Sequence, residues 1–410
     1  MRLEPYPGYN DSRIDWLGTI PENWVIKRLK DITDFINGAA FKPDEWSDQG
    51  VPIIRIENLN GSESYNYHEG IVDQRYIVRN GDLLFSWSGN RGTSFGPHRW
   101  SENGIYYLNQ HIFRLETEKC NKNWLYWMLK AATLYIEEKA HGIIGMVHVT
   151  KGELGAVPIP LPSPNDQQAI AAFLDHETAR IDALIQKKEQ MIELLKEKRI
   201  ALITQAVTKG LDPNVKMKDS GIEWLGEVPE HWDVVLLKRI CRFAYGDSLP
   251  DDLRNDGIIP VYGSNGAVGL HDSSNTSSPV IIIGRKGSYG KLNYSFKRVF
   301  AIDTTYFVDE NTTKACIKWL YYILLCLELD IGSKDSAVPG LAREDAYQNY
   351  TTICGFIEQQ AIASYLNRET SKIDSLTNRI LESITLLHEY RSSLIHSAVT
   401  GKIDLRGYNE

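Results

Sequence analysis

The sequence predicts an α+β protein in which two similar domains are each followed by a long helix, and the two helices pack as an antiparallel coiled coil. Three observations predict this fold: a phrase that occurs twice, a second repeated block late in each half, and two long helical patterns. The period of about 200 residues is far longer than a solenoid repeat, so a whole domain with its connecting element is duplicated.

The repeated phrase opens each half of the chain. Residues 12–21 read SRIDWLGTIP and residues 220–229 read SGIEWLGEVP, a spacing of 208 residues. The second block, at residues 167–184 and 359–376, recurs at a spacing of 192 residues. The second half has therefore lost sixteen residues between the two blocks, so constant ends enclose a variable middle.

The long helical patterns follow the variable middles. From residue 165 to 209 apolar residues keep helical spacing without glycine or proline, and Gly210 and Pro213 end the run. This predicts a helix of roughly 42 residues, about 60 Å long. The second copy keeps the register and ends at Gly401. Each helix needs a partner along its length, and the other copy has matching length and register; two unrelated surface helices are the alternative.

The variable middles predict a β-rich core with a few helices. Strand-like runs are bounded by Gly, Ser and Asn, and two aromatic-rich helices have tryptophans that we assign to the core rather than to base stacking. The strands are expected at 51–56, 82–85, 280–283 and 305–308, and the helices at 124–129 and 319–324. The predicted divisions are a first domain at 1–163, a first long helix at 164–211, a second domain at 212–355, and a second long helix with its tail at 356–410.

From the composition we expect a cytoplasmic protein. The 410 residues carry a net charge of −8, and no apolar stretch of about 18 residues suggests a membrane span. The five cysteines are odd in number and never spaced Cys-x-x-Cys, which favours buried reduced thiols over disulfides or a zinc site.

Two stretches that lack acidic residues combine cations, aromatics and glycines, at 85–101 and 280–299. A glycine-rich basic loop after a strand can bring amides, hydroxyls and guanidinium groups to a phosphate backbone and to base edges. Gly89 and Gly92 align with Gly287 and Gly290, so both halves place such a loop at the same point; a solvated surface loop is the alternative. The candidate DNA-contacting residues are Arg285, Lys286, Ser288, Tyr289, Lys291 and Arg298 in the second half, and Ser88, Asn90, Arg91, Thr93 and Arg99 in the first.

Catalytic motifs are missing from the sequence. Residues 284–292 have the wrong glycine spacing for a phosphate-binding loop, and Leu292 stands where Ser or Thr should hold the metal. There is no Asn/Asp-Pro-Pro-Tyr/Phe signature of amino-methyltransferases, no His-Glu-x-x-His pair and no Gly-x-Ser-x-Gly elbow. His141 and His148 are interpreted as loop residues. We therefore expect neither catalytic residues nor metal ligands nor a cofactor in this chain.

Taken together, four segments resemble the specificity subunit of type I restriction-modification enzymes, and the resemblance covers essentially the whole chain. The segments are residues 220–232, residues 283–290 followed by 303–307, residues 337–343, and residues 358–362. The resemblance implies two DNA target-recognition domains, spaced along double-stranded DNA by the antiparallel helices. It also implies that each helix region docks a modification (methyltransferase) subunit, two in all, with restriction subunits in the same assembly. S-adenosylmethionine and ATP with Mg²⁺ are expected on those partners.

The two halves depart from each other in the contact loops. Residues 85–89 read FSWSG where 283–287 read IGRKG, and residues 145–151 differ from 338–343. Such divergence fits two domains that read different half-sites. The alternatives are a stand-alone nucleic-acid-modifying enzyme with an unrecognised site, which the missing motifs disfavour, and a coiled-coil scaffold, which the paired basic loops disfavour.

Overall fold

The computed structural model describes residues 4–139, 146–330 and 340–408, and the chain folds as two compact units. Unit 1 comprises Met1–Lys187 with Glu382–Glu410, and unit 2 comprises Lys188–Leu381. Two long helices, α5 (Pro164–Lys209) and α8 (Phe356–Val399), each give one part to either unit. They are 46 and 44 residues long, so both predicted long helices are confirmed.

The main sheet of unit 1 has four antiparallel strands in the order β10-β8-β12-β4, and a second sheet has the order β6-β5-β11-β7 with β11 parallel to β5. The strands are β1 (Tyr9–Asp11), β2 (Thr19–Pro21), β3 (Val25–Arg28), β4 (Asp34–Asn37), β5 (Val51–Ile54), β6 (Asn66–His68), β7 (Ile77–Val78), β8 (Leu83–Ser86), β9 (Ser88–Asn90), β10 (Gly96–Arg99), β11 (Tyr106–Leu108), β12 (Ile112–Glu116), β13 (Met146–His148) and β14 (Pro158–Leu161). Its shorter helices are α1 (Leu29–Ile32), η1 (Pro43–Glu45), α2 (Ile56–Leu59), η2 (Gln74–Tyr76), α3 (Lys122–Lys139) and α4 (Lys151–Ala156).

Unit 2 repeats this plan with a four-stranded antiparallel sheet in the order β18-β24-β21-β22 and a smaller sheet in the order β20-β19-β23, where β23 is parallel to β19. The strands are β15 (Met217–Asp219), β16 (Glu227–Pro229), β17 (Asp233–Leu236), β18 (Ala244–Tyr245), β19 (Ile259–Gly263), β20 (Gly266–His271), β21 (Val280–Gly284), β22 (Leu292–Ser295), β23 (Phe300–Ala301), β24 (Thr305–Val308) and β25 (Tyr350–Ile353). The shorter helices are η3 (Leu237–Arg239), η4 (Asp251–Leu253), α6 (Ile317–Leu325) and α7 (Arg343–Ala346). The strands and helices predicted in both middles are thus confirmed.

Two glycines fix the residue-by-residue match between the main sheets. A Cβ atom on Gly38 would lie 2.1 Å from the Asn109 carbonyl oxygen, and one on Gly246 would lie 2.1 Å from the Ile302 carbonyl oxygen. Only glycine permits this approach of two backbones, because the carbonyl belongs to the main chain and cannot move away. The strand before each glycine, β4 or β18, is therefore held at the same place, which makes β4, β12, β8 and β10 the counterparts of β18, β24, β21 and β22.

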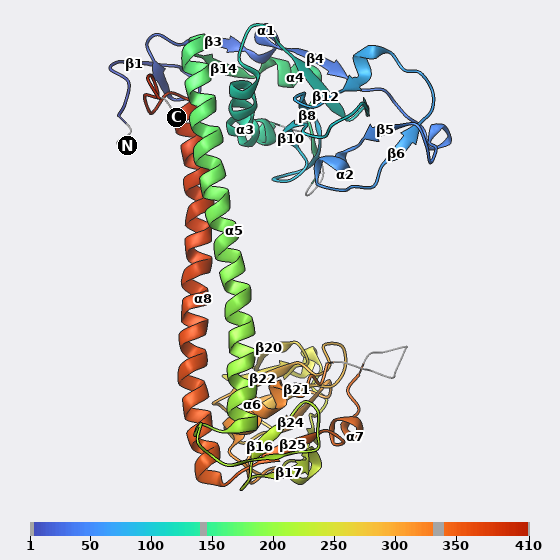
Figure 1. The fold of residues 1–410 in the computed structure, drawn as a ribbon, viewed down its shortest axis with the longest axis vertical. Helices are drawn as coiled ribbons and strands as arrows, with labels where there is room; N and C mark the ends of the chain where they lie inside the picture. The colour runs from blue at the N-terminus through green and yellow to red at the C-terminus, as the bar shows by residue number, and fades with distance from the viewer. Residues whose placement is uncertain (1–3, 140–145, 331–339, 409–410) are drawn as a thin grey trace. The chain divides into compact units, whose positions relative to one another are not determined.

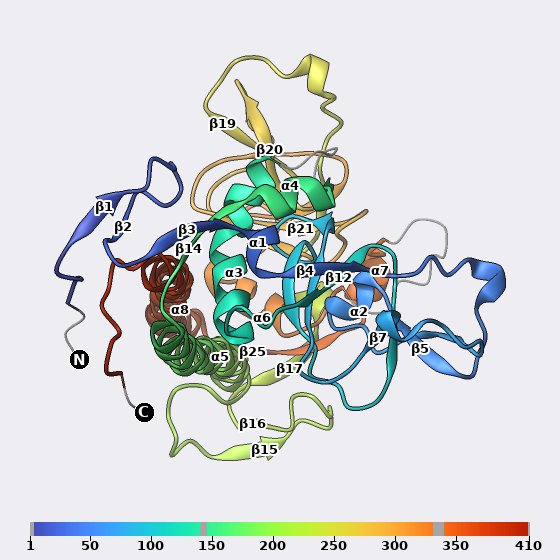
Figure 2. The same cartoon turned by 90° about the horizontal axis from the view of Figure 1, so that it is seen from above.

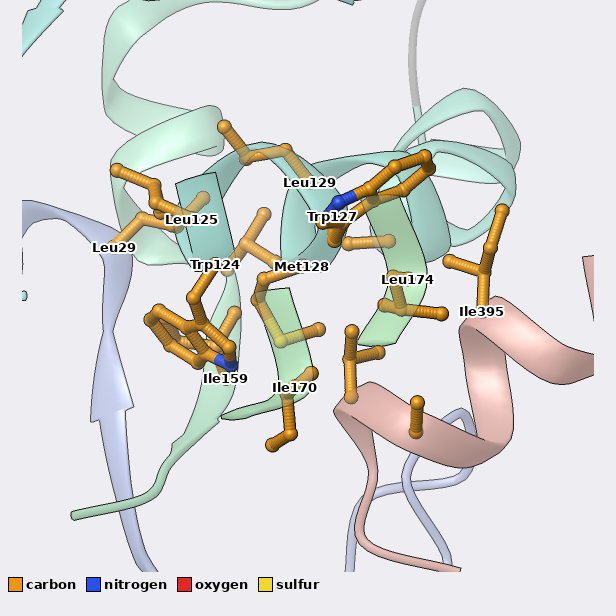
Figure 3. Packing of buried hydrophobic residues seen from close by; sticks show 14 of the residues in the cluster. Leu29, Trp124, Leu125, Trp127, Met128, Leu129, Ile159, Ile170, Leu174 and Ile395 are labelled. Carbon is orange, nitrogen blue, oxygen red and sulfur yellow. The ribbon is translucent and has the colours of Figure 1, made fainter. Parts of the chain in front are cut away.

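The core of unit 1 lies where α3 packs on the main sheet and on the long helices. Trp124 and Met128 of α3 are fully buried with Ile159, Ile170 and Leu174, and Figure 3 shows them in one cluster. In unit 2 the fully buried Trp319 of α6 has the corresponding place in the second cluster. The tryptophans of both helices are core residues, as the sequence indicates.

The glutamines of the repeated block explain why this block recurs. Gln167 is buried; its side chain accepts a hydrogen bond from the Asn121 amide (2.7 Å) and donates to the Pro162 carbonyl (2.9 Å). Gln359 does the same with the Cys316 amide and the Cys354 carbonyl (both 2.8 Å). Each glutamine ties the start of a long helix to the segment that enters α3 or α6, so the block holds helix and domain together.

The two long helices run antiparallel within each unit. In unit 1 the early part of α5 lies beside the late part of α8, as Figure 1 and Figure 2 both show. There Arg391 pairs with Asp182 (2.9 Å). In unit 2 the late part of α5 meets the early part of α8, where Arg199 pairs with Asp374 (3.4 Å). The same Arg–Asp pair thus occurs once in each unit, and the predicted antiparallel pairing is confirmed. The four domain boundaries predicted from the sequence, at 1–163, 164–211, 212–355 and 356–410, stay a prediction.

Candidate nucleic-acid interface

Glycines shape the loop between β21 and β22. A Cβ atom on Gly284 would lie 2.0 Å from the Ser288 carbonyl oxygen, and one on Gly290 would lie 2.3 Å from the Asp330 amide nitrogen. Gly287 and Gly290 have φ values of +72° and +74°, which side chains with a Cβ rarely adopt. The loop closes where the Gly290 amide donates to the Gly284 carbonyl (2.8 Å). These residues therefore have to be glycine for the loop to fold back this tightly.

Arg285 leaves the end of β21 and is held by a carbonyl and two rings. Its Nη1 donates to the Asp303 carbonyl (3.0 Å), and its guanidinium carbon lies 5.0 Å from the centroid of the Tyr245 ring and 5.9 Å from that of Tyr306. Burial raises the pKa of the Tyr306 phenol, which donates to the Leu341 carbonyl (3.1 Å). A guanidinium group has five N–H donors, so Arg285 is oriented and still has donors for a further partner.

The other predicted residues of this loop differ in exposure. Lys286 and Ser288 are exposed, and Tyr289 is half-buried. Lys291 is exposed but its Nζ is already bonded to the side chain (2.8 Å) and the carbonyl (3.0 Å) of Asn265. Arg298 is exposed and lies beyond β22, outside the glycine loop. The structure therefore brings Arg285, Lys286, Ser288 and Lys291 onto one loop and leaves Arg298 on the next one.

The sequence analysis missed two residues at this loop, Tyr245 and Arg343. The guanidinium carbon of Arg343 lies 5.1 Å from the same Tyr245 ring that contacts Arg285, and its Nη2 pairs with Glu344 (3.2 Å). Tyr245 is 48% exposed, so two cations and one accessible ring form a single cluster. Arg343 stands at the end of the segment 337–343, which carries part of the family resemblance and could have marked Arg343 as a candidate. Residues 337–339 of this segment lie outside the described residues.

The first-half loop follows β8 and is anchored to the end of α3. Gly92 has a φ of +73°, and its amide donates to the buried Glu137 carboxylate (3.2 Å). Arg91 is exposed, and its Nη2 donates to the Glu137 carbonyl (3.3 Å). Of the remaining predicted residues, Asn90 and Thr93 are exposed on this loop and Ser88 is half-buried in β9.

Arg99 is placed apart from that loop, in the packing of the sheet on the helices. Its Nη1 pairs with Asp175 (2.6 Å), and its guanidinium carbon lies 4.2 Å from the Tyr126 ring centroid. In unit 2 the strand position of Arg99 is occupied by Tyr294 of β22, and Lys318 of α6 lies over this ring, with Nζ 4.0 Å from the ring centroid. In unit 1 a cation from the strand packs on a ring of the helix, and in unit 2 a cation from the helix packs on a ring of the strand. Arg99 therefore occupies a packing position.

The described residues contain no group of three or more His, Cys, Asp or Glu side chains that could hold a metal ion. His148 lies in β13, and His141 lies outside the described residues. All five cysteines are free, with Cys241 and Cys354 buried and the others half-buried. Among the described helices none is long and apolar enough to cross a membrane.

Comparisons with known proteins point to one family. Residues 21–194 match the family model of the type I restriction modification DNA specificity domain. The chain is similar to the specificity subunit of the EcoBI type I restriction enzyme of Escherichia coli, with 24% identity over 96% of this chain and 89% of that protein. It is also similar to the MjaVIII specificity subunit of Methanocaldococcus jannaschii, with 29% identity over 46% of this chain and 47% of that protein.

Solved structures share the fold. A chain from a study of complex assembly and conformational transition in a type I R-M system aligns with a TM-score of 0.73 at 14% identity, over 94% of this chain and 99% of that one. The HsdS subunit from Thermoanaerobacter tengcongensis aligns with a TM-score of 0.55 at 16% identity, over 94% of this chain and 98% of that one.

Proposed function

Because the chain belongs to the specificity subunits of type I restriction-modification enzymes, we propose that each of its halves reads one part of a bipartite DNA target. The chain is a non-catalytic DNA-recognition subunit that works in a complex with modification and restriction subunits. The observation that carries the proposal is the matched main sheet of each unit, in which β8 and β21 end in a glycine loop with exposed polar and cationic residues.

The candidate contact residues have different roles in this proposal. Lys286, Lys291 and Arg91 are exposed cations suited to phosphates, which position a protein on DNA without reading its sequence. Ser88, Asn90, Thr93, Ser288 and Tyr289 supply hydroxyl and amide groups beside them, and Arg298 adds a cation on the neighbouring loop. Because Arg99 is bound to Asp175 and Tyr126, we leave it out of the proposed DNA contacts.

The long helices present one apolar surface in each unit, and we propose that each surface docks one modification subunit. In unit 1 Leu184 and Leu386 are 44% and 63% exposed, beside a hollow of about 350 Å³ formed by residues of both helices. In unit 2 their repeat counterparts Leu376 and Leu194 are 39% and 64% exposed. Pairs of exposed leucines at matching positions favour two equivalent docking sites and hence two modification subunits.

The docking proposal is tested with one variant per unit. Leu386→Asp and Leu194→Asp should each reduce the number of bound modification subunits from two to one in native mass measurements, and the double variant should bind none. Glu389→Ala, an exposed neighbour on α8, serves as the control and should retain two. Retention of two subunits by the double variant would place the docking surface elsewhere.

The partners are also proposed to supply the chemistry. The modification subunits would carry S-adenosylmethionine, and the restriction subunits ATP with Mg²⁺. The test is to incubate DNA and S-adenosylmethionine with the purified chain alone and with modification subunits added. Methylation of a two-part target only in the second mixture is the expected result. Methyl transfer by the chain alone would favour the alternative, a nucleic-acid-modifying enzyme in its own right.

A further inference from the structure

Trp87 and Arg285 occupy the same position in the two main sheets. Phe113 of β12 pairs with Phe85, and its counterpart Tyr306 of β24 pairs with Ile283. Phe85 of β8 therefore corresponds to Ile283 of β21. Two residues farther along stand Trp87 in the first half and Arg285 in the second. This is where each strand of the sheet gives way to the candidate DNA loop.

The backbone clamps both residues in the same way. The Trp87 amide donates to the His111 carbonyl (3.3 Å), and the Arg285 amide donates to the Thr304 carbonyl (2.8 Å). On the other side, the Val149 amide donates to the Trp87 carbonyl (2.9 Å). The Leu341 amide donates to the Arg285 carbonyl in the same way (2.8 Å). The position is therefore rigid in both units, because the main chain is bonded on both sides.

The two side chains even use equivalent acceptors. The Trp87 indole N–H donates to the Gln110 carbonyl (2.9 Å), and Arg285 Nη1 donates to the Asp303 carbonyl (3.0 Å). Gln110 and Asp303 each directly precede the residue, His111 or Thr304, whose carbonyl accepts from the clamped amide. Both side chains are thus aimed by the same backbone feature, although one is aromatic and the other cationic.

The surroundings of this position change together with it. In the second half Tyr245 and Arg343 flank Arg285, whereas the first half has Asn37 at the place of Tyr245 and Lys151 at the place of Arg343. Lys151 turns away to donate to the Phe35 carbonyl (2.7 Å). Trp87 packs instead on His111, with ring centroids 5.3 Å apart. Three positions on separate elements therefore vary as a set on an unchanged backbone.

Building on the proposed function, we infer that this position determines the base preference of each half-site, and that Arg285 reads a guanine. A guanidinium group can donate two hydrogen bonds to the O6 and N7 atoms of guanine in the major groove. The single N–H of Trp87 is already used, so Trp87 presents only an apolar ring to its half-site. Tyr245 and Arg343 act as positioning residues. The Tyr245 ring orients the Arg285 guanidinium, and Arg343 packs on the same ring.

The test uses the complex with modification subunits and a DNA library randomised in both half-sites. Arg285→Ala should lower discrimination at one base pair by roughly five- to 150-fold, the loss expected for one bidentate contact. Preference in the first half-site should stay the same. Arg285→Lys keeps the charge but not the planar fork, so it should relax the same base pair. Lys291→Ala is the matched control and should weaken methylation of all library members alike.

The positioning role of the Tyr245 ring is tested by two substitutions. Tyr245→Asn installs the residue of the first half and should relax the preference at the base pair that Arg285 reads, whereas Tyr245→Phe keeps the ring and should preserve it. The inference is overturned if Arg285→Ala affects all library members equally, or if Arg285→Lys keeps the wild-type preference. If the wild-type complex itself shows no sequence preference, the proposed function fails before this inference is reached.

Discussion

The loops that follow β8 and β21 start from the same backbone and are held in different ways. In the first half the loop is anchored by a side chain, because the buried Glu137 carboxylate accepts from the Gly92 amide (3.2 Å). In the second half the corresponding Gly290 lies directly against the main chain at Asp330, with no room for a Cβ atom. The sheet is kept while the loop, its anchor and its outward side chains change. Under the proposed function, the recognition loops can therefore diverge while the sheet that positions them stays the same.

The comparison breaks most severely if the shared backbone approach is blocked. Gly246→Ala should destabilise unit 2 by about 3 kcal/mol, the upper range for overpacking, because the new methyl group meets the Ile302 carbonyl. Gly38→Ala should do the same to unit 1 only. Hydrogen exchange resolved by peptide measures each unit separately. Gly152→Ala, where the nearest neighbour is 3.9 Å away, is the control; equal loss in both units from one substitution would contradict independent frameworks.

A second prediction concerns a titratable residue that only one sheet carries. Burial, together with the nearby Lys130, lowers the pKa of His98 to about 4. Its counterpart in the register of β22 is Asn293, which does not titrate. Between pH 6.5 and 4 the unfolded chain binds a proton that the folded unit 1 does not. The free energy of unfolding of unit 1 should therefore fall as the pH is lowered, by up to about 1.4 kcal/mol per pH unit.

His98→Asn installs the residue of the other half and should remove this component. The measurement is hydrogen exchange of unit 1 at several pH values between 4 and 7, for the wild type and the variant. An identical pH slope in both proteins would show that His98 is not the cause.

Much of the fold could be predicted because the constant blocks make the same buried contacts in both halves. Gln167, Gln359 and the tryptophans of α3 and α6 are buried in both units, so their spelling recurs. The glycine loops were also found, because glycine marks a required backbone shape. Tyr245 was missed because strand pairing brings it to Arg285 from 40 positions away in the chain. Trp87 lies in the acid-free stretch at 85–101, but it was not chosen as a contact residue because the choice there rested on cations and small polar residues.

Arg99 shows the opposite case, a residue that the sequence marks as a DNA contact and that the structure pairs with an acid from a distant part of the chain. It lies in the acid-free stretch after β8, but the acid that binds it, Asp175, comes from the long helix. Arg99→Ala should therefore destabilise unit 1 by about 1 kcal/mol through the lost ion pair and ring contact, without a change in DNA preference. Lys318→Ala, which removes the cation that packs on Tyr294 in unit 2, should have a similarly small effect on that unit. A relaxed base preference in the Arg99→Ala complex would restore Arg99 to the DNA surface.

The central claim is that each half reads its own part of the target on a shared framework. The most direct measurement is to exchange residues 31–160 for the equivalent segment of another specificity subunit and to map the methylated sites of the assembled complex across a genome. We predict a target in which one half-site is new and the other is unchanged. Loss or change of both half-sites in a folded, assembled complex would contradict the claim and indicate one composite recognition site.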